Sequence, residues 1–286
     1  MKINGVLLIV LVMLFAPSPS AQWPAYRTPA VPRTATGEPI LDAPTPRTPD
    51  GKPDLSGNWV RFRGEGGGTG NTPPPAQPPG TPPLATFFDV GAGFPEGLPF
   101  QPWAAELKKT RNDANSKDNP DARCLPMGFM QFHMHNQPRK IIQTPALTVI
   151  IYEANYGLRY IYTDGRALPP NGSPQPFWYG YSVGKWDGDT LVVETNNLRD
   201  NGWLDVRGSP FTDQARITER FRRVNFGRLE IDITIDDPKA YTRPFTVRVN
   251  QQIMVDTDMI EFICHENDQF TNYLNRADVK VKDVVK

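Results

Sequence analysis

The sequence predicts an all-β domain, either an antiparallel meander barrel or a β-sandwich, with a long N-terminal arm and one short helix. Three observations favour this fold class. From residue 139 onward, apolar and polar residues alternate in short runs, which places alternate side chains on opposite faces of a strand. Turn sequences such as Asp164-Gly165 and Asn225-Phe226-Gly227 separate these runs. No long helical pattern lies between the runs, so neighbouring strands are expected to pair antiparallel.

The first 21 residues have the features of a cleavable signal peptide. Lys2 supplies a positive start, residues 6–16 are apolar, and small residues follow up to Ala21. An apolar run of this length, as a helix, is too short to cross the ~30 Å hydrocarbon core of a bilayer. The sequence therefore predicts a periplasmic or secreted protein with no membrane span after cleavage.

Residues 22–99 are expected to form an extended arm and linker. Gly and Pro make up 54 of the 286 residues, and most of the Pro lies before residue 103. Pro lacks a backbone donor and the stretch has no apolar periodicity, so regular structure is not expected there. The apolar segment around Trp59 is the exception and is expected to dock on the domain.

The β domain is expected to span residues 100–278, with a charged tail at 279–286. Its helix is predicted over residues 103–111. Pro102 lies just before it, where the backbone N–H that proline lacks would have no hydrogen-bond partner within the helix. Eight runs are predicted as strands: residues 141–142, 147–153, 158–163, 190–195, 217–224, 229–235, 245–253 and 259–264. In the run 229–235 the odd-numbered residues are Leu or Ile and the even-numbered ones are polar. One face of the sheet should therefore pack on a core while the other meets water.

The chain has two cysteines, Cys124 and Cys264. In an oxidising compartment they either form a disulfide or remain as buried free thiols. The disulfide is the favoured interpretation, and it would tie the entrance of the domain to its last predicted strand.

Several segments resemble a large family of secreted bacterial proteins of unassigned function. They are residues 50–59 (DGKPDLSGNW), 124–126 (CLP), 140–145 (KIIQTP), 162–166 (YTDGR), 180–195 (GYSVGKWDGDTLVVET), 218–223 (TERFRR), 234–238 (TIDDP) and 241–244 (YTRP). The resemblance covers nearly all of the predicted mature chain and implies an exported, single-domain, lipocalin-like barrel, but no activity. The family pattern usually lacks paired histidines, so any role of the histidines here would belong to this chain alone.

Two carboxylates and two arginines are the candidate catalytic residues: Glu219, Glu153, Arg159 and Arg220. Glu219 lies between Ile217 and Phe221 on the apolar side of its predicted strand. A carboxylate that points into an apolar interior must be paired or have its pKa raised, and either condition suits acid–base catalysis. The alternative, which we favour, is a structural Glu–Arg pair that fixes strand register, with Arg166 and Arg222 as further possible partners.

Aromatic residues gather in a Pro- and Gly-rich segment and just after it, and the candidate ligand-binding residues among them are Trp178, Tyr181, Trp186 and Trp203. With Tyr179 they could line the mouth of an apolar pocket or stack on a sugar ring. Core packing explains them equally well.

Three histidines are a candidate metal site. His133 and His135 would share one face of an extended segment, and His265 would come near them through the disulfide. Surface or loop histidines are the favoured interpretation, because the spacing alone is a weak signal.

The charge balance and missing motifs limit the function classes. Lys and Arg number 31, equal to Asp and Glu, so a nucleic-acid partner is not expected. The sequence has no phosphate-binding loop, dinucleotide-binding glycine pattern or nucleophile elbow, and we expect no cofactor. The prediction is an exported β-barrel protein that binds a small apolar or aromatic molecule. A periplasmic lyase, isomerase or hydrolase is the alternative, and attachment to a surface polysaccharide through Trp is a weaker one.

Overall fold

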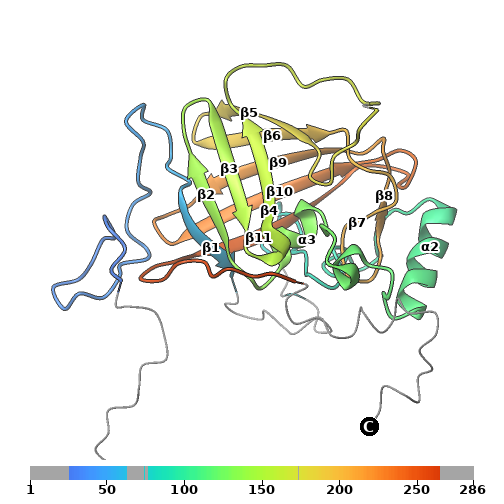
Figure 1. Ribbon diagram of the computed structural model, residues 1–286, viewed down its shortest axis with the longest axis horizontal. Coiled ribbons are helices and arrows are strands. Elements are labelled where there is room, and N and C mark those ends of the chain that lie inside the picture. The colour runs from blue at the N-terminus through green and yellow to red at the C-terminus, as the bar shows by residue number, and fades with distance from the viewer. Residues whose placement is uncertain (1–25, 63–73, 75–76, 173, 265–286) are drawn as a thin grey trace, which may run out of the picture.

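Nine strands close into a barrel in the computed structural model, which describes residues 26–62, 74, 77–172 and 174–264 (Figure 1). The ring runs β1-β11-β10-β9-β6-β5-β4-β3-β2 and returns to β1. Its strands are β1 (Gly57–Arg61), β2 (Arg139–Gln143), β3 (Leu147–Tyr152), β4 (Gly157–Tyr162), β5 (Tyr181–Asp187), β6 (Thr190–Asn196), β9 (Arg216–Arg223), β10 (Arg228–Asp236) and β11 (Phe245–Met254). A separate two-stranded ribbon consists of β7 (Gly202–Trp203) and β8 (Pro210–Phe211). The predicted all-β class and the barrel alternative are confirmed.

The barrel departs from a pure antiparallel meander at one place. β4 and β5 are parallel, whereas all other neighbours in the ring are antiparallel. The chain must cross over between parallel strands, and residues 163–180 make this connection, with no helix in its described parts, 163–172 and 174–180.

Most of the predicted strands exist, and the differences have physical reasons. Residues 259–264 form no strand, and β5 was not predicted because Ser182, Gly184 and Lys185 interrupt the apolar alternation. β1 lies inside the predicted arm and pairs with both β2 and β11. The barrel therefore begins before the boundary predicted at residue 100, because the fully buried Trp59 is a core residue of its first strand.

The interior face of the barrel follows the predicted alternation. Leu229, Ile231, Ile233 and Ile235 of β10 are all buried. On the outer face of the same strand, Asp232 is paired with Arg248 of β11. The outside of β9–β11 is thus covered by ion pairs, while the inside forms the core.

Two α-helices accompany the barrel in the part of the chain that the structure describes. α2 (Pro102–Asp113) confirms the predicted helix and extends it slightly. α3 (Phe129–Met134) was not predicted, because all six of its residues are buried and it therefore shows no amphipathic period. Phe132 of α3 stacks on Tyr152 at the end of β3, so this short helix covers the barrel beside the start of β4 (Figure 1). Single 3₁₀ turns lie at Pro120–Arg123 and Ala154–Tyr156.

The described part of the arm lies against the barrel. Before β1 it has only isolated bridges, Arg33 with Pro39 and Arg47 with Pro53. Arg47 is paired with Asp189 at the tip of the β5–β6 hairpin.

The predicted signal peptide and charged tail lie outside the described residues. No helix in the described ranges is long and apolar enough to cross a membrane.

Candidate functional site

Two of the predicted catalytic residues, Arg159 and Glu219, form an ion pair inside the barrel. It is the only arginine–glutamate pair of the interior within the described residues. Arg159 of β4 donates from Nη1 to Glu219 Oε1 of β9 at 3.0 Å, and its Nη2 contacts Oε2. Both side chains are fully buried. Two parallel hydrogen bonds between a guanidinium and a carboxylate give this pair a fixed geometry.

Further contacts hold Arg159 in place. Its Nε and Nη2 donate to Ser182 Oγ at 3.2 and 3.1 Å, and Nη2 donates to Thr195 Oγ1 at 2.9 Å. Its guanidinium carbon lies 4.0 Å from the ring centroid of Phe129 in α3. The buried cation therefore has partners from three strands and a helix, as a charge removed from water requires.

His133 of α3 completes this cluster. Its Nε2 lies 2.9 Å from Glu219 Oε1, and burial lowers its pKa below the ordinary value. A neutral imidazole can donate from Nε2 to the carboxylate, which leaves Nδ1 as an acceptor. Burial would raise the pKa of Glu219, but Arg159 and His133 outweigh it and hold that pKa at about 2. The cluster therefore contains one carboxylate anion, one guanidinium cation and a neutral histidine.

The other two predicted catalytic residues do not join the cluster. Glu153 follows the end of β3, where it accepts a hydrogen bond from the backbone N–H of Ile260 at 3.0 Å. Arg220 points to the outside of β9 and is paired with Asp187 at 2.9 Å. Strand alternation explains the second result, because residue 220 lies on the opposite face from residue 219.

The predicted aromatic residues divide between two places. Trp178 and Trp203 line one surface groove of about 460 Å³, which we call the tryptophan groove, between α2, the segment before α3 and the β7–β8 ribbon. Tyr181 and Trp186 belong to β5, and Trp186 lines a different groove with Arg220. The sequence thus grouped residues that the fold separates.

Each tryptophan of the tryptophan groove carries an arginine on its ring. The guanidinium carbon of Arg199 lies 4.5 Å from the centroid of Trp178, and that of Arg111 lies 4.3 Å from the centroid of Trp203. A bridge between Phe177 and Leu198 places Trp178 beside Arg199. Cation–π contacts of this kind hold aromatic rings in fixed positions.

The two arginines differ in how they are bound. Arg111 of α2 donates to the carbonyl oxygens of Asn201, Gly202 and Gly208 at 3.1–3.2 Å. Burial lowers its pKa to about 10, so it stays charged at neutral pH. Arg199 is exposed, and within the described residues its guanidinium forms no ion pair. Its donors are therefore available to a bound molecule.

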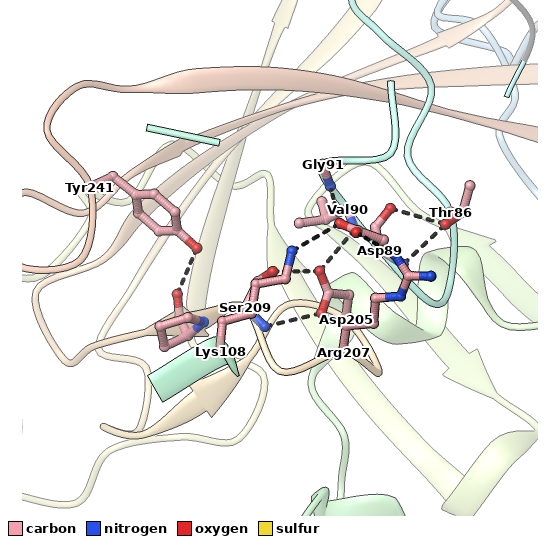
Figure 2. A network of polar contacts seen from close by, with 10 residues as sticks. Thr86, Asp89, Val90, Gly91, Lys108, Asp205, Arg207, Ser209 and Tyr241 are labelled. Atoms are coloured by element: carbon pink, nitrogen blue, oxygen red, sulfur yellow. Dashed lines mark hydrogen bonds and ion pairs between the residues drawn. The ribbon is translucent and has the colours of Figure 1, made fainter. Parts of the chain in front are cut away.

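Sequence reasoning missed a buried carboxylate beside this groove. Figure 2 shows Asp205, which accepts hydrogen bonds from the backbone N–H groups of Val90 and Ser209 and from the Ser209 hydroxyl at 2.6–3.0 Å. Burial raises the pKa of Asp205. Asp89 is paired nearby with Lys108 at 3.2 Å and Arg207 at 3.0 Å. The polar pattern Asp205-Val206-Arg207-Gly208-Ser209 was the available signal, because a short side chain of this kind often binds nearby backbone N–H groups.

The carboxylates of Figure 2 join three parts of the chain. Asp205 connects the loop at 86–91 to the turn between β7 and β8, and Asp89 connects that loop to α2. Their hydrogen bonds are made with the protein itself, and Asp205 is fully buried. The network therefore links α2 to the β7–β8 segment, and both of these contribute residues to the lining of the tryptophan groove.

The predicted metal site has no support in the described residues. His133 lies in α3 and His135 just after it, not in an extended segment as predicted, and their side chains make separate contacts with Glu219 and the backbone N–H of Gln137. His265 lies outside the described residues. No group of three His, Cys, Asp or Glu side chains in the described part of the chain could hold a metal ion.

The predicted disulfide is confirmed. Cys124 and Cys264 are bonded, with 5.5 Å between their Cα atoms. The bond ties the segment after β11 to the turn before α3 and closes a loop with a sequence separation of 140 residues.

Comparisons of the chain with protein-family models, with curated proteins and with solved structures found no match. The resemblance to a family of secreted bacterial proteins therefore stays a prediction.

Proposed function

We propose that this protein binds a small aromatic molecule in the tryptophan groove. The observation that carries the proposal is the pair of arginine–tryptophan stacks, Arg199 on Trp178 and Arg111 on Trp203, on the lining of one groove. Such stacks hold flat apolar surfaces in place before a ligand arrives, which lowers the entropic cost of binding.

The groove also offers polar groups that would orient a ligand. Arg199 has unused donors, while Asp200 and Asn201 line the same hollow and can accept hydrogen bonds. Small-molecule sites combine mostly apolar walls with a few polar groups in this way. A planar ring with one acidic or hydrogen-bond-accepting substituent fits this arrangement best, with the ring on Trp178 and the substituent at Arg199.

The barrel interior supports the enzymatic alternative less well. Glu219 and Arg159 are fully buried and His133 is 1% exposed, so a substrate cannot reach them without a rearrangement. Their polar contacts are all made with protein groups, including Ser182 and Thr195, as expected of a cluster that holds β4 and β9 together across the barrel interior. We therefore assign these residues a structural role and place binding at the surface groove.

We further propose that the protein acts outside the cytoplasm. The features of a signal peptide at residues 1–21 support export. A disulfide is typical of an oxidising compartment, which agrees with that proposal.

Two-dimensional NMR of the labelled protein with 2-naphthoate as the probe tests the proposed site. We expect the indole N–H signals of Trp178 and Trp203 to shift saturably, and the aliphatic analogue cyclohexanecarboxylate to shift them far less. Trp178→Ala should abolish the effect. Trp103→Ala is the matched control, since Trp103 is an exposed α2 residue outside the groove lining. Shifts that persist in Trp178→Ala, or no saturable shift in the unsubstituted protein, would refute the site.

A further inference from the structure

The ring of strands is incompletely paired beside β4. β5 pairs with β6 along its whole length, but its parallel pairing with β4 ends at Tyr162 and Val183. Within the described residues, 184–187 therefore have a neighbouring strand on one side only. A strand edge of this kind carries unpaired backbone donors and acceptors.

The geometry of the β5–β6 turn identifies a residue of β5 whose backbone N–H and C=O groups point toward the unpaired side. Gly188 and Asp189 form a two-residue hairpin turn, and Gly188 has the positive φ of 56° that such a turn requires. The flanking residues Asp187 and Thr190 then form a hydrogen-bonded pair, and the direction of the backbone groups alternates along the strand. Trp186 consequently points its N–H and C=O away from β6, toward the unpaired side.

A groove of about 830 Å³ extends from this open edge over the outer faces of β6 and β9, since Val192, Glu194 and Arg220 line it together with residues 183–187. Residues 163–168 form its far wall, and Arg166 holds that wall in position. Arg166 is paired with Asp164 at 2.6 Å, donates to the Tyr181 hydroxyl at 3.1 Å and lies over the Tyr162 ring at 3.7 Å. These contacts tie the wall to the end of β4 and to the start of β5, so its position is fixed before a partner binds.

The lining of the groove carries three cations and two carboxylates. Arg166, Lys185 and Arg220 stand against Asp187 and Glu194. Arg166 and Arg220 are committed to Asp164 and Asp187, whereas Lys185 is exposed and forms no ion pair within the described part of the chain. Lys185 and Glu194 therefore remain for a partner within the described residues, and Lys185 is the one that lies on the open strand itself, whereas Glu194 lies on β6.

We propose that this groove binds an extended acidic peptide segment, which adds as a short strand to the open edge of β5 in line with β4. The unpaired backbone of Trp186 would supply main-chain hydrogen bonds, and Lys185 would select an acidic side chain. Strand addition to a free sheet edge is an established mode of peptide recognition. This surface is distinct from the tryptophan groove, and the proposal does not depend on the function proposed above.

The test uses the blocked peptide acetyl-Glu-Val-Thr-Val-Glu-amide as the probe. We expect it to slow hydrogen exchange of the Trp186 amide and to shift backbone NMR signals of residues 184–187. A control peptide with both Val nitrogens methylated keeps the side chains but loses backbone donors, and it should not bind. Equal binding of the methylated peptide, no binding of the unmodified one, or shifts confined to another surface would overturn the proposal.

A charge exchange tests the role of Lys185. Lys185→Glu should weaken binding of the acidic peptide about two- to fivefold, the range expected for one exposed charge pair. The same variant should prefer acetyl-Lys-Val-Thr-Val-Lys-amide. Lys117→Glu makes the same charge change outside the groove lining and should leave both affinities unchanged. Identical behaviour of the two variants would contradict the proposed contact.

Discussion

Arg199 lies over the ring of Trp178, with its guanidinium carbon 4.5 Å from the ring centroid. The two residues are 21 positions apart in the sequence and meet because the backbone of Phe177 bridges to that of Leu198. The N–H of Phe177 donates to the carbonyl of Asn197 at 2.9 Å, and the N–H of Arg199 donates to the carbonyl of Phe177 at 3.1 Å. A backbone contact thus positions both an aromatic surface and a cation that has no ion pair among the described residues at the edge of the tryptophan groove.

Substitution of Arg199 should separate the contribution of the cation from that of the ring. We expect Arg199→Ala to weaken 2-naphthoate binding about two- to fivefold, because the variant loses one exposed contact between the guanidinium and the carboxylate of the probe, worth up to roughly 1 kcal/mol. Arg199→Lys should keep part of the affinity, because it keeps the charge. Isothermal titration calorimetry measures both. Arg216→Ala, at an exposed position of β9 outside the groove lining, serves as a control, and an equal loss there would contradict the assignment.

The Glu219–Arg159 pair should be important for stability. Glu219→Gln leaves a fully buried guanidinium without its counter-charge, so the free energy of unfolding should fall by about 3–5 kcal/mol. Glu194→Gln, at an exposed position of β6, should change it by less than about 0.5 kcal/mol. Denaturant unfolding followed by circular dichroism gives both values. A Glu219→Gln variant as stable as the parent would overturn the structural role and revive the enzymatic alternative.

The same cluster predicts how stability depends on pH. The pKa of Glu219 is about 2 in the folded protein against an ordinary 4.5, so its stabilising contribution is present above pH 4.5 and is lost as the pH falls toward 2. The pKa of His133 is lowered, so the unfolded chain binds its proton first and stability also falls below its ordinary pKa of 6.5. Unfolding free energies measured from pH 7 to 2 should decline in both windows. In Glu219→Gln the decline below pH 4.5 should be shallower, and an identical slope would contradict this assignment.

The disulfide should stabilise the fold by constraining the unfolded chain. A loop with the 140-residue separation of Cys124 and Cys264 corresponds to about 5 kcal/mol in the chain-entropy model. The variant with both cysteines changed to Ser should therefore unfold at much lower denaturant concentration. Thiol titration of unfolded, unreduced protein should find no free thiols, and two thiols per chain would disprove the bond in the protein as produced.

The sequence predicted the barrel strands well where one face is apolar and the other polar, as in β9, β10 and β11. It also located β4, predicted over residues 158–163, but not the face of that strand that points inward, because Arg159 is buried whereas Leu158 and Tyr160 are 41% and 46% exposed. Alternation identified Glu219 as a buried carboxylate, yet the choice of Arg159 as its partner depended on the closure of the ring. No local pattern contains that information, because β4 and β9 are not adjacent in sequence or in the sheet.

The aromatic site could be predicted only in part. Trp178 and Trp203 were recognised as candidates by residue type, but their grouping with Trp186 was not supported, because the fold places β5 at a different groove. Arg111 and Arg199 were not candidates at all. Their positions follow from the docking of α2 and from the bridge at Phe177, which are tertiary contacts between distant segments.

The most direct test of the proposed binding function is the identity of the small molecules that the protein retains. Purified protein would be incubated with a bacterial metabolite extract, separated from free metabolites and analysed by mass spectrometry, beside a Trp178→Ala/Arg199→Ala variant. We expect aromatic compounds with an acidic or hydrogen-bond-accepting group to be enriched on the parent protein and absent from the variant. Retention of the same compounds by both proteins, or of no aromatic compound by either, would contradict binding in the tryptophan groove.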